Sequence, residues 1–237
     1  MICLHRWRGL EGKALRLTSA VLAIVLLGAF DASGQSAVAS RQAGAAPAPP
    51  AADGEAPGEW SFSASTYFYQ VRDDDNYAQP TFIADREWLH LEARYNYEAQ
   101  KAGSLWVGRN FSFGDKLTLE VTPMVGGVFG DLNGIAPGYN LSLSYWKVEL
   151  SSQSEYVFDL EHRSGNFFYT WSELTYSPVD WFRTGLVVQR TKAYETELDI
   201  QRGLLAGFSY KKIDFTAHVF NFGWTDPTVV LAVGVNF

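Results

Sequence analysis

The chain ends on Thr228-Val229-Val230-Leu231-Ala232-Val233-Gly234-Val235-Asn236-Phe237, a stretch in which apolar residues alternate with small or polar ones. In an extended strand, alternate side chains lie on opposite faces. One face is then uniformly apolar, and it carries Leu231, Val233, Val235 and Phe237. A strand with an apolar face opposite a small or polar face suits a position between lipid and a lumen.

This ending resembles the closing strand of bacterial outer-membrane β-barrels, in which a terminal aromatic residue is part of the assembly signal. The resemblance is carried by the apolar face just described, which ends on Phe237. It implies a location in the outer membrane, contact with outer-membrane lipid and insertion by the barrel assembly machinery. The resemblance covers residues 59–237 through pattern and topology, and it points to the broad class rather than to a narrower family.

The other end of the chain has the features of a secretory signal peptide. Four basic residues lie within the first sixteen positions, and the apolar segment 20–30 follows them. Small residues at Ala37-Val38-Ala39 predict cleavage before Ser40, and Ala32-Ser33-Gly34 offers a second position. We therefore expect residues 1–39 to be a signal peptide that is removed after export. Residues 40–58 are rich in Ala and Pro, and we expect a flexible periplasmic leader there.

The remaining body, residues 59–237, alternates with a period of two in one segment after another. The pattern predicts an all-β fold, a closed antiparallel up-and-down transmembrane β-barrel. About eleven segments can be counted, whereas single-chain bacterial barrels use even numbers. Ten to twelve strands fit the length, and an additional short strand at Thr81–Arg86 favours twelve. A soluble β-sandwich or lipocalin-like barrel would also alternate, but the terminal aromatic strand favours the membrane.

The segments between the strands fall into two kinds. Short turns flanked by aromatic residues are typical of the periplasmic side, and we expect them at residues 113–116, 177–180 and 211–214. Longer polar or Gly-rich segments are typical of extracellular loops, and we expect them at residues 73–80, 130–138, 192–196 and 221–227. The alternation slips near Trp146, which predicts a β-bulge.

Composition excludes several classes of function. Residues 1–39 hold four of the 19 basic and two of the 26 acidic residues, so 15 basic and 24 acidic residues remain and the net charge is −9. An acidic chain without a basic run is a poor candidate for binding nucleic acid. Cys3, the only cysteine, lies in the predicted signal peptide, which excludes disulfides and thiolate metal sites from the mature chain. The remaining histidines are scattered, and we expect no metal site and no cofactor.

Charged residues on the polar faces predict the contents of the lumen. His90, Glu92 and Arg94 share one face of a strand that alternates with Leu89, Leu91, Ala93, Tyr95 and Tyr97 on the lipid side. The residues expected to line the lumen are His90, Glu92, Arg94, Glu120, Glu173 and Arg183. They could form a network of ion pairs that fills the lumen, or a constriction that selects solutes by charge. The two interpretations are compatible if the network leaves a gap.

A second motif raises the possibility of an enzyme. His162-Arg163-Ser164 resembles the His-x-Ser pair of outer-membrane lipid A deacylases. That resemblance implies His162 as base and Ser164 as nucleophile, with Glu173 or Glu161 orienting the imidazole. Gly165 stands where that family carries asparagine, and the same stretch is typical of a hairpin turn. We therefore expect no catalytic activity.

Three classes of function follow. The first is a porin-like passive channel for small solutes. The alternative is a structural or envelope-interaction barrel with a filled lumen, and an outer-membrane lipid hydrolase comes third. The contents of the lumen separate the first two, because small inward residues such as Gly126, Gly185 and Gly207 leave space. Large inward residues, for which the pattern predicts Trp88 and Trp106, fill it.

Overall fold

The computed structural model of the chain describes residues 58–70, 76–161, 165–193, 199–222 and 227–237. These residues form strands, and no helix among them is long and apolar enough to cross a membrane. The strands are β1 Ser61–Gln70, β2 Tyr77–Arg86, β3 Leu89–Tyr95, β4 Ala102–Arg109, β5 Phe111–Phe113, β6 Leu117–Gly130, β7 Gly134–Tyr145, β8 Val148–Asp159, β9 Phe167–Val179, β10 Phe182–Ala193, β11 Asp199–Tyr210, β12 Ile213–Phe220 and β13 Thr228–Asn236.

The strands form one antiparallel sheet that closes on itself. Apart from β4 and β5, strands that follow one another in sequence pair with each other; β1 pairs with β13, and both β4 and β5 pair with β6. The short strand β5 continues β4 beyond Asn110 and keeps the same register on β6, with Gly108 opposite Met124 and Phe111 opposite Val121. The barrel therefore has twelve strands around its circumference, plus the extra strand β5. This confirms the predicted fold class and the favoured strand number.

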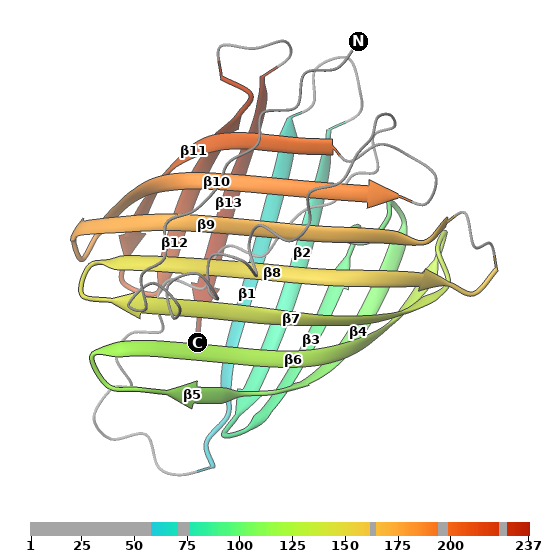
Figure 1. Cartoon of the computed structure of the whole chain (residues 1–237), viewed down its shortest axis with the longest axis horizontal. Coiled ribbons are helices and arrows are strands. Elements are labelled where there is room, and N and C mark those ends of the chain that lie inside the picture. Colours follow the sequence, from blue (N-terminus) through green and yellow to red (C-terminus); the bar gives the residue numbers. More distant parts are fainter. Residues whose placement is uncertain (1–57, 71–75, 162–164, 194–198, 223–226) are drawn as a thin grey trace, which may run out of the picture. The chain divides into compact units, whose positions relative to one another are not determined.

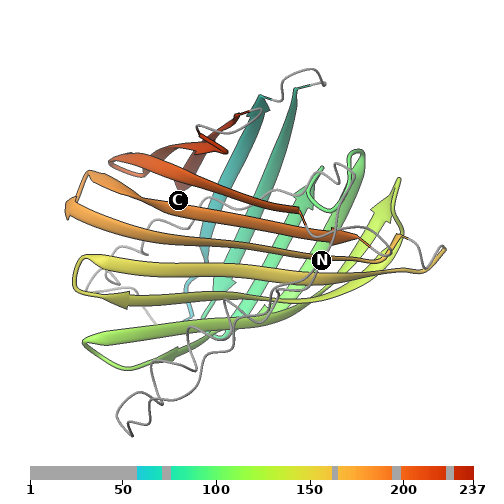
Figure 2. The same cartoon turned by 45° about the horizontal axis from the view of Figure 1, so that its top comes forward.

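Figure 1 shows the two walls of the barrel, with β6 to β11 in front and β1 to β4 behind them. Figure 2, turned by 45°, shows the same strands surrounding one interior. The connections 87–88, 114–116, 146–147, 180–181 and 211–212 are short, and they define the short-turn end of the barrel. The opposite end, where most connections are longer and include 96–101, is called the long-loop end. In barrels of this type the short turns are periplasmic, and we assign that end accordingly.

Lipid-facing and inward-facing residues alternate as predicted along most strands. In β1, Phe62 and Phe68 are exposed on the outer wall, whereas Tyr67 and Tyr69 are buried inside. Neighbouring strands combine these outward residues into apolar rows. One such row crosses β8, β9, β10 and β11, and its members are Leu150, Leu174, Leu186 and Leu204. An apolar outer band of this kind matches the hydrocarbon region of a bilayer.

Two aromatic residues lie on the side opposite to the predicted one. Tyr97 was expected to face lipid, but it is buried in the interior. The strand β3 ends at Tyr95, and Asn96 has a φ of +56°, so the alternation stops before Tyr97. Trp88 was expected to face inward, but it is exposed in the turn between β2 and β3. The preceding Glu87 has a φ of +50°, which reverses the chain there.

Several predicted boundaries were also wrong. Residues 77–80, assigned to an extracellular loop, are the start of β2. No β-bulge lies at Trp146, which has a φ of +53° in the tight turn between β7 and β8. Side-chain alternation cannot distinguish this reversal from a bulge, because both change which face a residue occupies. The segment 134–138, assigned to an extracellular loop, is the start of β7, where its glycines pack closely against the backbone of β8. The extra strand predicted at Thr81–Arg86 is present as part of β2. The predicted signal peptide and residues 40–57 of the leader lie outside the described residues.

Phe237 lies at the seam where the barrel closes. Its backbone nitrogen donates a hydrogen bond of 2.9 Å to the carbonyl oxygen of Phe62, next to the pairing of β1 with β13. Removing Phe237 deletes this bond and an exposed aromatic side chain from the short-turn end. We expect the folded fraction to fall severalfold after refolding in detergent, as measured by the gel shift between unheated and boiled samples. Exchange of Phe237 for tyrosine is the control, and normal folding of the truncated chain would contradict the prediction.

Candidate functional site

The interior is densely packed toward the long-loop end. Buried aromatic side chains reach into it from β1, β4, β9 and β12, and aliphatic ones come from most other strands. Trp171 is central to this packing, since its ring makes edge contacts with Tyr67, His218 and Phe220 at centroid distances of 5.2 to 6.3 Å. These buried side chains occupy the lumen toward the long-loop end. Any path for a solute must therefore pass them.

The turn between β3 and β4 folds into this packed section. Asn96 stabilises the turn, since its side chain donates to the Ala78 carbonyl at 3.0 Å and accepts from the Lys101 backbone nitrogen at 2.7 Å. Tyr97 and Glu98 are only 1% and 4% exposed. The Tyr97 ring packs edge-on against Tyr169 of β9, with centroids 5.9 Å apart. The turn thus reaches across the lumen instead of projecting into solvent.

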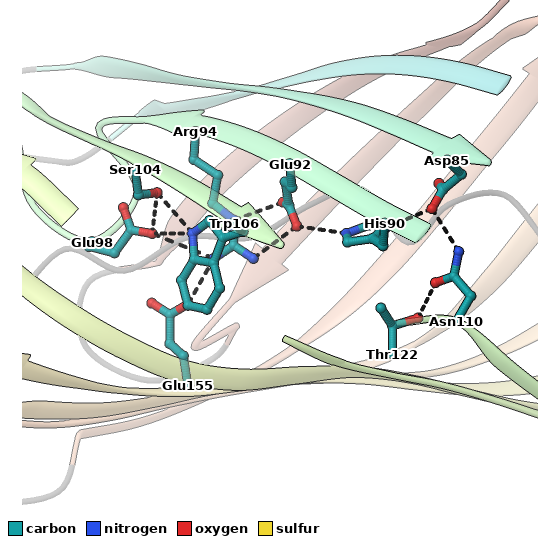
Figure 3. A network of polar contacts seen from close by, with 10 residues as sticks. All are labelled: Asp85, His90, Glu92, Arg94, Glu98, Ser104, Trp106, Asn110, Thr122 and Glu155. Carbon is teal, nitrogen blue, oxygen red and sulfur yellow. Dashed lines mark hydrogen bonds and ion pairs between the residues drawn. The ribbon is translucent and has the colours of Figure 1, made fainter. Parts of the chain in front are cut away.

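Arg94 is the centre of a buried charge network (Figure 3). Its Nε donates to Glu92 at 2.7 Å, and its Nη1 donates to Glu155 of β8 at 2.7 Å. The same Nη1 lies 3.6 Å from Glu98. Because β3 and β8 belong to different parts of the barrel wall, the bond from Arg94 to Glu155 bridges the interior. A buried cation with several carboxylate partners is strongly constrained in position.

Two aromatic rings enclose the guanidinium of Arg94. Its central carbon lies 4.2 Å from the centre of the Tyr97 ring and 4.4 Å from that of Trp106. The indole of Trp106 is itself held, because its Nε1 donates to Ser104 at 3.0 Å and to Glu98 at 3.2 Å. Cation–π contacts with two rings therefore add to the ion pairs.

Two of the inward glycines, Gly126 and Gly207, do not leave the space that was expected of them. The Trp106 ring covers Gly126 so closely that a Cβ at this position would overlap it. Gly207 is similarly covered by the side chain of Arg183. In both places the missing side chain lets a neighbouring large side chain lie flat against the wall. The lumen is consequently narrower than a count of small inward residues suggests.

The network continues from Arg94 toward the short-turn end. His90 lies between two carboxylates, with its Nε2 3.4 Å from Glu92 and its Nδ1 2.8 Å from Asp85. Asn110 then donates to Asp85 at 2.8 Å and accepts from Thr122 at 2.7 Å. The structure therefore brings His90, Glu92 and Arg94 into one continuous chain of polar contacts along the wall.

The other predicted residues lie in separate groups. Glu173 of β9 accepts hydrogen bonds from Trp171 at 2.9 Å and pairs with His218 of β12 at 3.0 Å. Arg183 donates to Thr216 at 2.6 Å and lies 3.4 Å from Asp214. Glu120 is exposed near the short-turn end and joins none of these groups within the described part of the chain. It therefore does not share a constriction with Glu92 and Arg94.

The interior carries more acidic than basic side chains. Asp85, Glu92, Glu98, Glu155, Glu173 and Asp214 face two arginines, Arg94 and Arg183, and two histidines. Burial raises the pKa of the Glu98 carboxyl. Within the described residues, no group of three or more His, Cys, Asp or Glu side chains could hold a metal ion. The described part of the interior thus has an excess of acidic side chains.

The lumen differs toward the short-turn end. Its inward side chains are short and hydroxyl-bearing, and they are only partly buried or exposed. They include Ser61, Ser63, Ser65, Ser142, Ser144 and Ser151. Two carboxylates lie among them, Glu120 and Glu149, and Ser142 donates to Glu149 at 2.9 Å. This part of the lumen is therefore polar, acidic and accessible.

The position of Glu173 does not fit the role that the hydrolase hypothesis gave it, which was to orient the imidazole of His162. That hypothesis requires the orienting carboxylate on the lipid-facing wall, whereas Glu173 is buried in the interior with Trp171 and His218. Glu161 accepts a hydrogen bond from Asn133 at 2.8 Å. His162 and Ser164 lie outside the described residues.

Comparison with known proteins supports the fold. No family model matches the chain, and no curated protein matches it either. Among solved structures, the KdgM porin superposes with a TM-score of 0.54 at 11% identity, over 74% of this chain and 99% of that one. A KdgM porin in complex with disordered oligogalacturonate gives a TM-score of 0.51 at 11% identity, over 75% and 99% of the two chains.

The chain is a β-barrel of the bacterial outer-membrane type. The likeness to the KdgM porin extends over nearly the whole of that protein. At 11% identity the likeness concerns the fold. The function has to be argued from the lumen of this chain.

Proposed function

We propose that the protein is a passive porin-like channel for small solutes and that it favours neutral and cationic solutes over anions. The observation that carries the proposal is the acidic excess along the lumen of a twelve-strand barrel. Charged side chains along a pore select permeating ions of the opposite sign. We propose also that the barrel is inserted by the barrel assembly machinery and contacts outer-membrane lipid through its apolar wall.

Buried polar atoms without hydrogen-bond partners support a lumen that contains water. Gln153 of β8 is buried, and neither end of its side-chain amide has a hydrogen-bond partner among the described residues. The same holds for Oε1 of Glu155 and Oε1 of Gln79. Buried polar atoms are nearly always hydrogen-bonded, to protein or to water. Polar atoms of this kind along an inward face suit an interior that water and polar solutes enter.

Charge argues against polyanions as solutes. The KdgM porin was solved with oligogalacturonate, a polymer of acidic sugars. In the present chain such a solute would meet the carboxylates around Arg94 and, at the periplasmic short-turn end, Glu120 and Glu149. Like charges in a narrow, partly desolvated passage repel strongly. We therefore infer that the solutes of this barrel differ in charge from oligogalacturonate.

The test is single-channel recording from the refolded chain in a planar bilayer, after the gel shift has established folding. We expect discrete conductance steps and a reversal potential in a KCl gradient that indicates cation preference. The variant with both Glu120→Gln and Glu149→Gln should lose a large part of that preference, because it removes two lumen charges. Glu87→Gln, in a short turn, is the matched control.

The second candidate is a structural barrel whose lumen stays filled. The packed aromatic section around Trp171 and the inward-folded turn 96–101 favour it. A folded barrel that gives no conductance steps under any voltage would support this candidate and overturn the channel. Steps with anion preference would instead contradict the proposed selectivity while leaving a channel in place.

A further inference from the structure

A chain of neighbouring side chains crosses the lumen from Arg94 to Tyr67. Glu155 reaches from β8 to Arg94 of β3, where its carboxylate accepts a hydrogen bond of 2.7 Å (Figure 3). Gln153 lies two positions before Glu155, on the same face of β8, and is paired with Trp171 of β9. The Trp171 ring then contacts the Tyr67 ring of β1 at a centroid distance of 6.3 Å. The chain therefore joins β3 to β1 by way of the opposite wall.

Gln79 of β2 closes this chain into a ring. It is paired with Tyr67, and its Nε2 donates to the carbonyl oxygen of Asn96, two positions after Arg94, at 2.7 Å. Every member of the ring is at most 4% exposed. We call these six residues the lumen ring: Tyr67, Gln79, Arg94, Gln153, Glu155 and Trp171.

The lumen ring contains polar atoms that have no hydrogen-bond partner among the described residues. They are Oε1 of Gln79, Oε1 of Glu155 and both ends of the Gln153 amide. The Gln79 oxygen is fixed as an acceptor, because the nitrogen of the same amide donates to Asn96. An ionised carboxylate also only accepts. The ring therefore offers three acceptor oxygens but only one donor nitrogen, and a ligand that fits it must mainly donate.

The charge around the ring favours a cation as that ligand. The guanidinium of Arg94 lies 2.7 to 3.6 Å from three carboxylates, those of Glu92, Glu98 and Glu155. A protonated His90 does not remove this excess, because it also contacts a fourth carboxylate, that of Asp85. Buried carboxylates are costly without cations. A positively charged ligand should therefore be held more tightly here than a neutral one.

We propose that the lumen ring binds the ammonium group of a small organic cation. A primary ammonium group has three N–H donors, as many as the ring has acceptor oxygens without partners. Tyr67 and Trp171 supply aromatic surface for the hydrocarbon part of the cation and attract its charge. The proposal rests on the proposed channel function for the role of the cation as a permeating solute, but not for the binding itself.

The test is a calorimetric titration of the folded barrel in a non-ionic detergent, which measures binding without conductance. The probe is butylammonium, and its chemical controls are butanol, which lacks the charge, and tetramethylammonium, which lacks N–H donors. We expect saturable binding of butylammonium and about tenfold weaker binding, or less, of both controls. Gln153→Leu keeps a similar volume and removes the amide. It should lower the affinity for butylammonium about tenfold, because a hydrogen bond to a charged group is lost.

A matched control comes from β11. Gln201→Leu makes the same exchange outside the lumen ring and should bind butylammonium as the wild type does. Equal binding of butylammonium and butanol by the wild-type chain would overturn the proposal, even if Gln153→Leu failed to fold. Tighter binding of glucose than of butylammonium would also overturn it and assign the ring to neutral sugars.

The same titration separates this proposal from the channel function. Butylammonium binding to a barrel that gives no conductance steps would support the binding site and overturn the channel. Conductance steps from a barrel that does not bind butylammonium would support the channel and overturn the binding site.

Discussion

Replacing Arg94 with methionine is expected to destabilise the barrel more than any other single change in the lumen. The guanidinium has its closest contacts with Glu92 and Glu155 and is enclosed by Tyr97 and Trp106. Methionine keeps much of the volume but leaves the carboxylates buried without their cation. Removing one partner of a buried ion pair typically costs about 3–5 kcal/mol. Urea unfolding in detergent, followed by tryptophan fluorescence, measures this loss.

A compensated variant separates the charge effect from a packing effect. Arg94→Met combined with Glu92→Gln and Glu155→Gln removes the uncompensated charges and keeps similar volumes. We expect it to regain a large part of the lost stability, because neutral amides are cheaper to bury than carboxylates. If Arg94→Met alone lowers the free energy of unfolding by less than about 1 kcal/mol, the charge network does not stabilise the barrel as predicted.

The alternation of side chains predicted the barrel because it is a local property of each strand. Side chains alternate along a pleated strand, and the outer face of the barrel contacts lipid. These two facts place Phe62 on the lipid side and Tyr67 on the lumen side. The number of strands also followed, since a closed barrel needs an even count and Thr81–Arg86 supplied the missing strand. These features required no knowledge of which strands lie opposite each other across the lumen.

The contacts inside the lumen could not be derived in the same way. Arg94 and Glu155 are 61 positions apart, and Glu173 and His218 are 45 apart. Whether two inward side chains meet depends on the stagger of the strands around the barrel, which alternation leaves open. For this reason Glu173 and Arg183, expected with Arg94, form groups of their own.

Two residues of the site were missed because they belong to a turn. Tyr97 and Glu98 follow Asn96, whose positive φ ends the strand and directs the chain inward. Asn is one of the residues that adopt this conformation most readily, so the local signal was present in the sequence. Glu98 and the serine that contacts it, Ser104, then complete the network around Trp106.

The inward-folded turn leads to the prediction with the largest effect on transport. Tyr97 and Glu98 occupy the lumen, whereas the strands that carry the turn are held by the pairing of β3 with β4. The double variant Tyr97→Ala and Glu98→Ala removes both side chains and leaves Arg94 with Glu92 and Glu155. Because the narrowest section of a pore dominates its resistance, we expect the single-channel conductance to rise by roughly twofold or more.

The same turn provides the control for this experiment. Gln100 is exposed and contributes no side chain to the packed section, so Gln100→Ala should leave the conductance unchanged. A wider pore should also admit larger neutral sugars, which a liposome swelling assay measures independently of charge. If the double variant folds but conducts and swells like the wild type, the passage for solutes does not run through the section that Tyr97 and Glu98 occupy. Such a result would place the path along the opposite wall, beside Arg183 and Thr216, where no turn enters the lumen among the described residues.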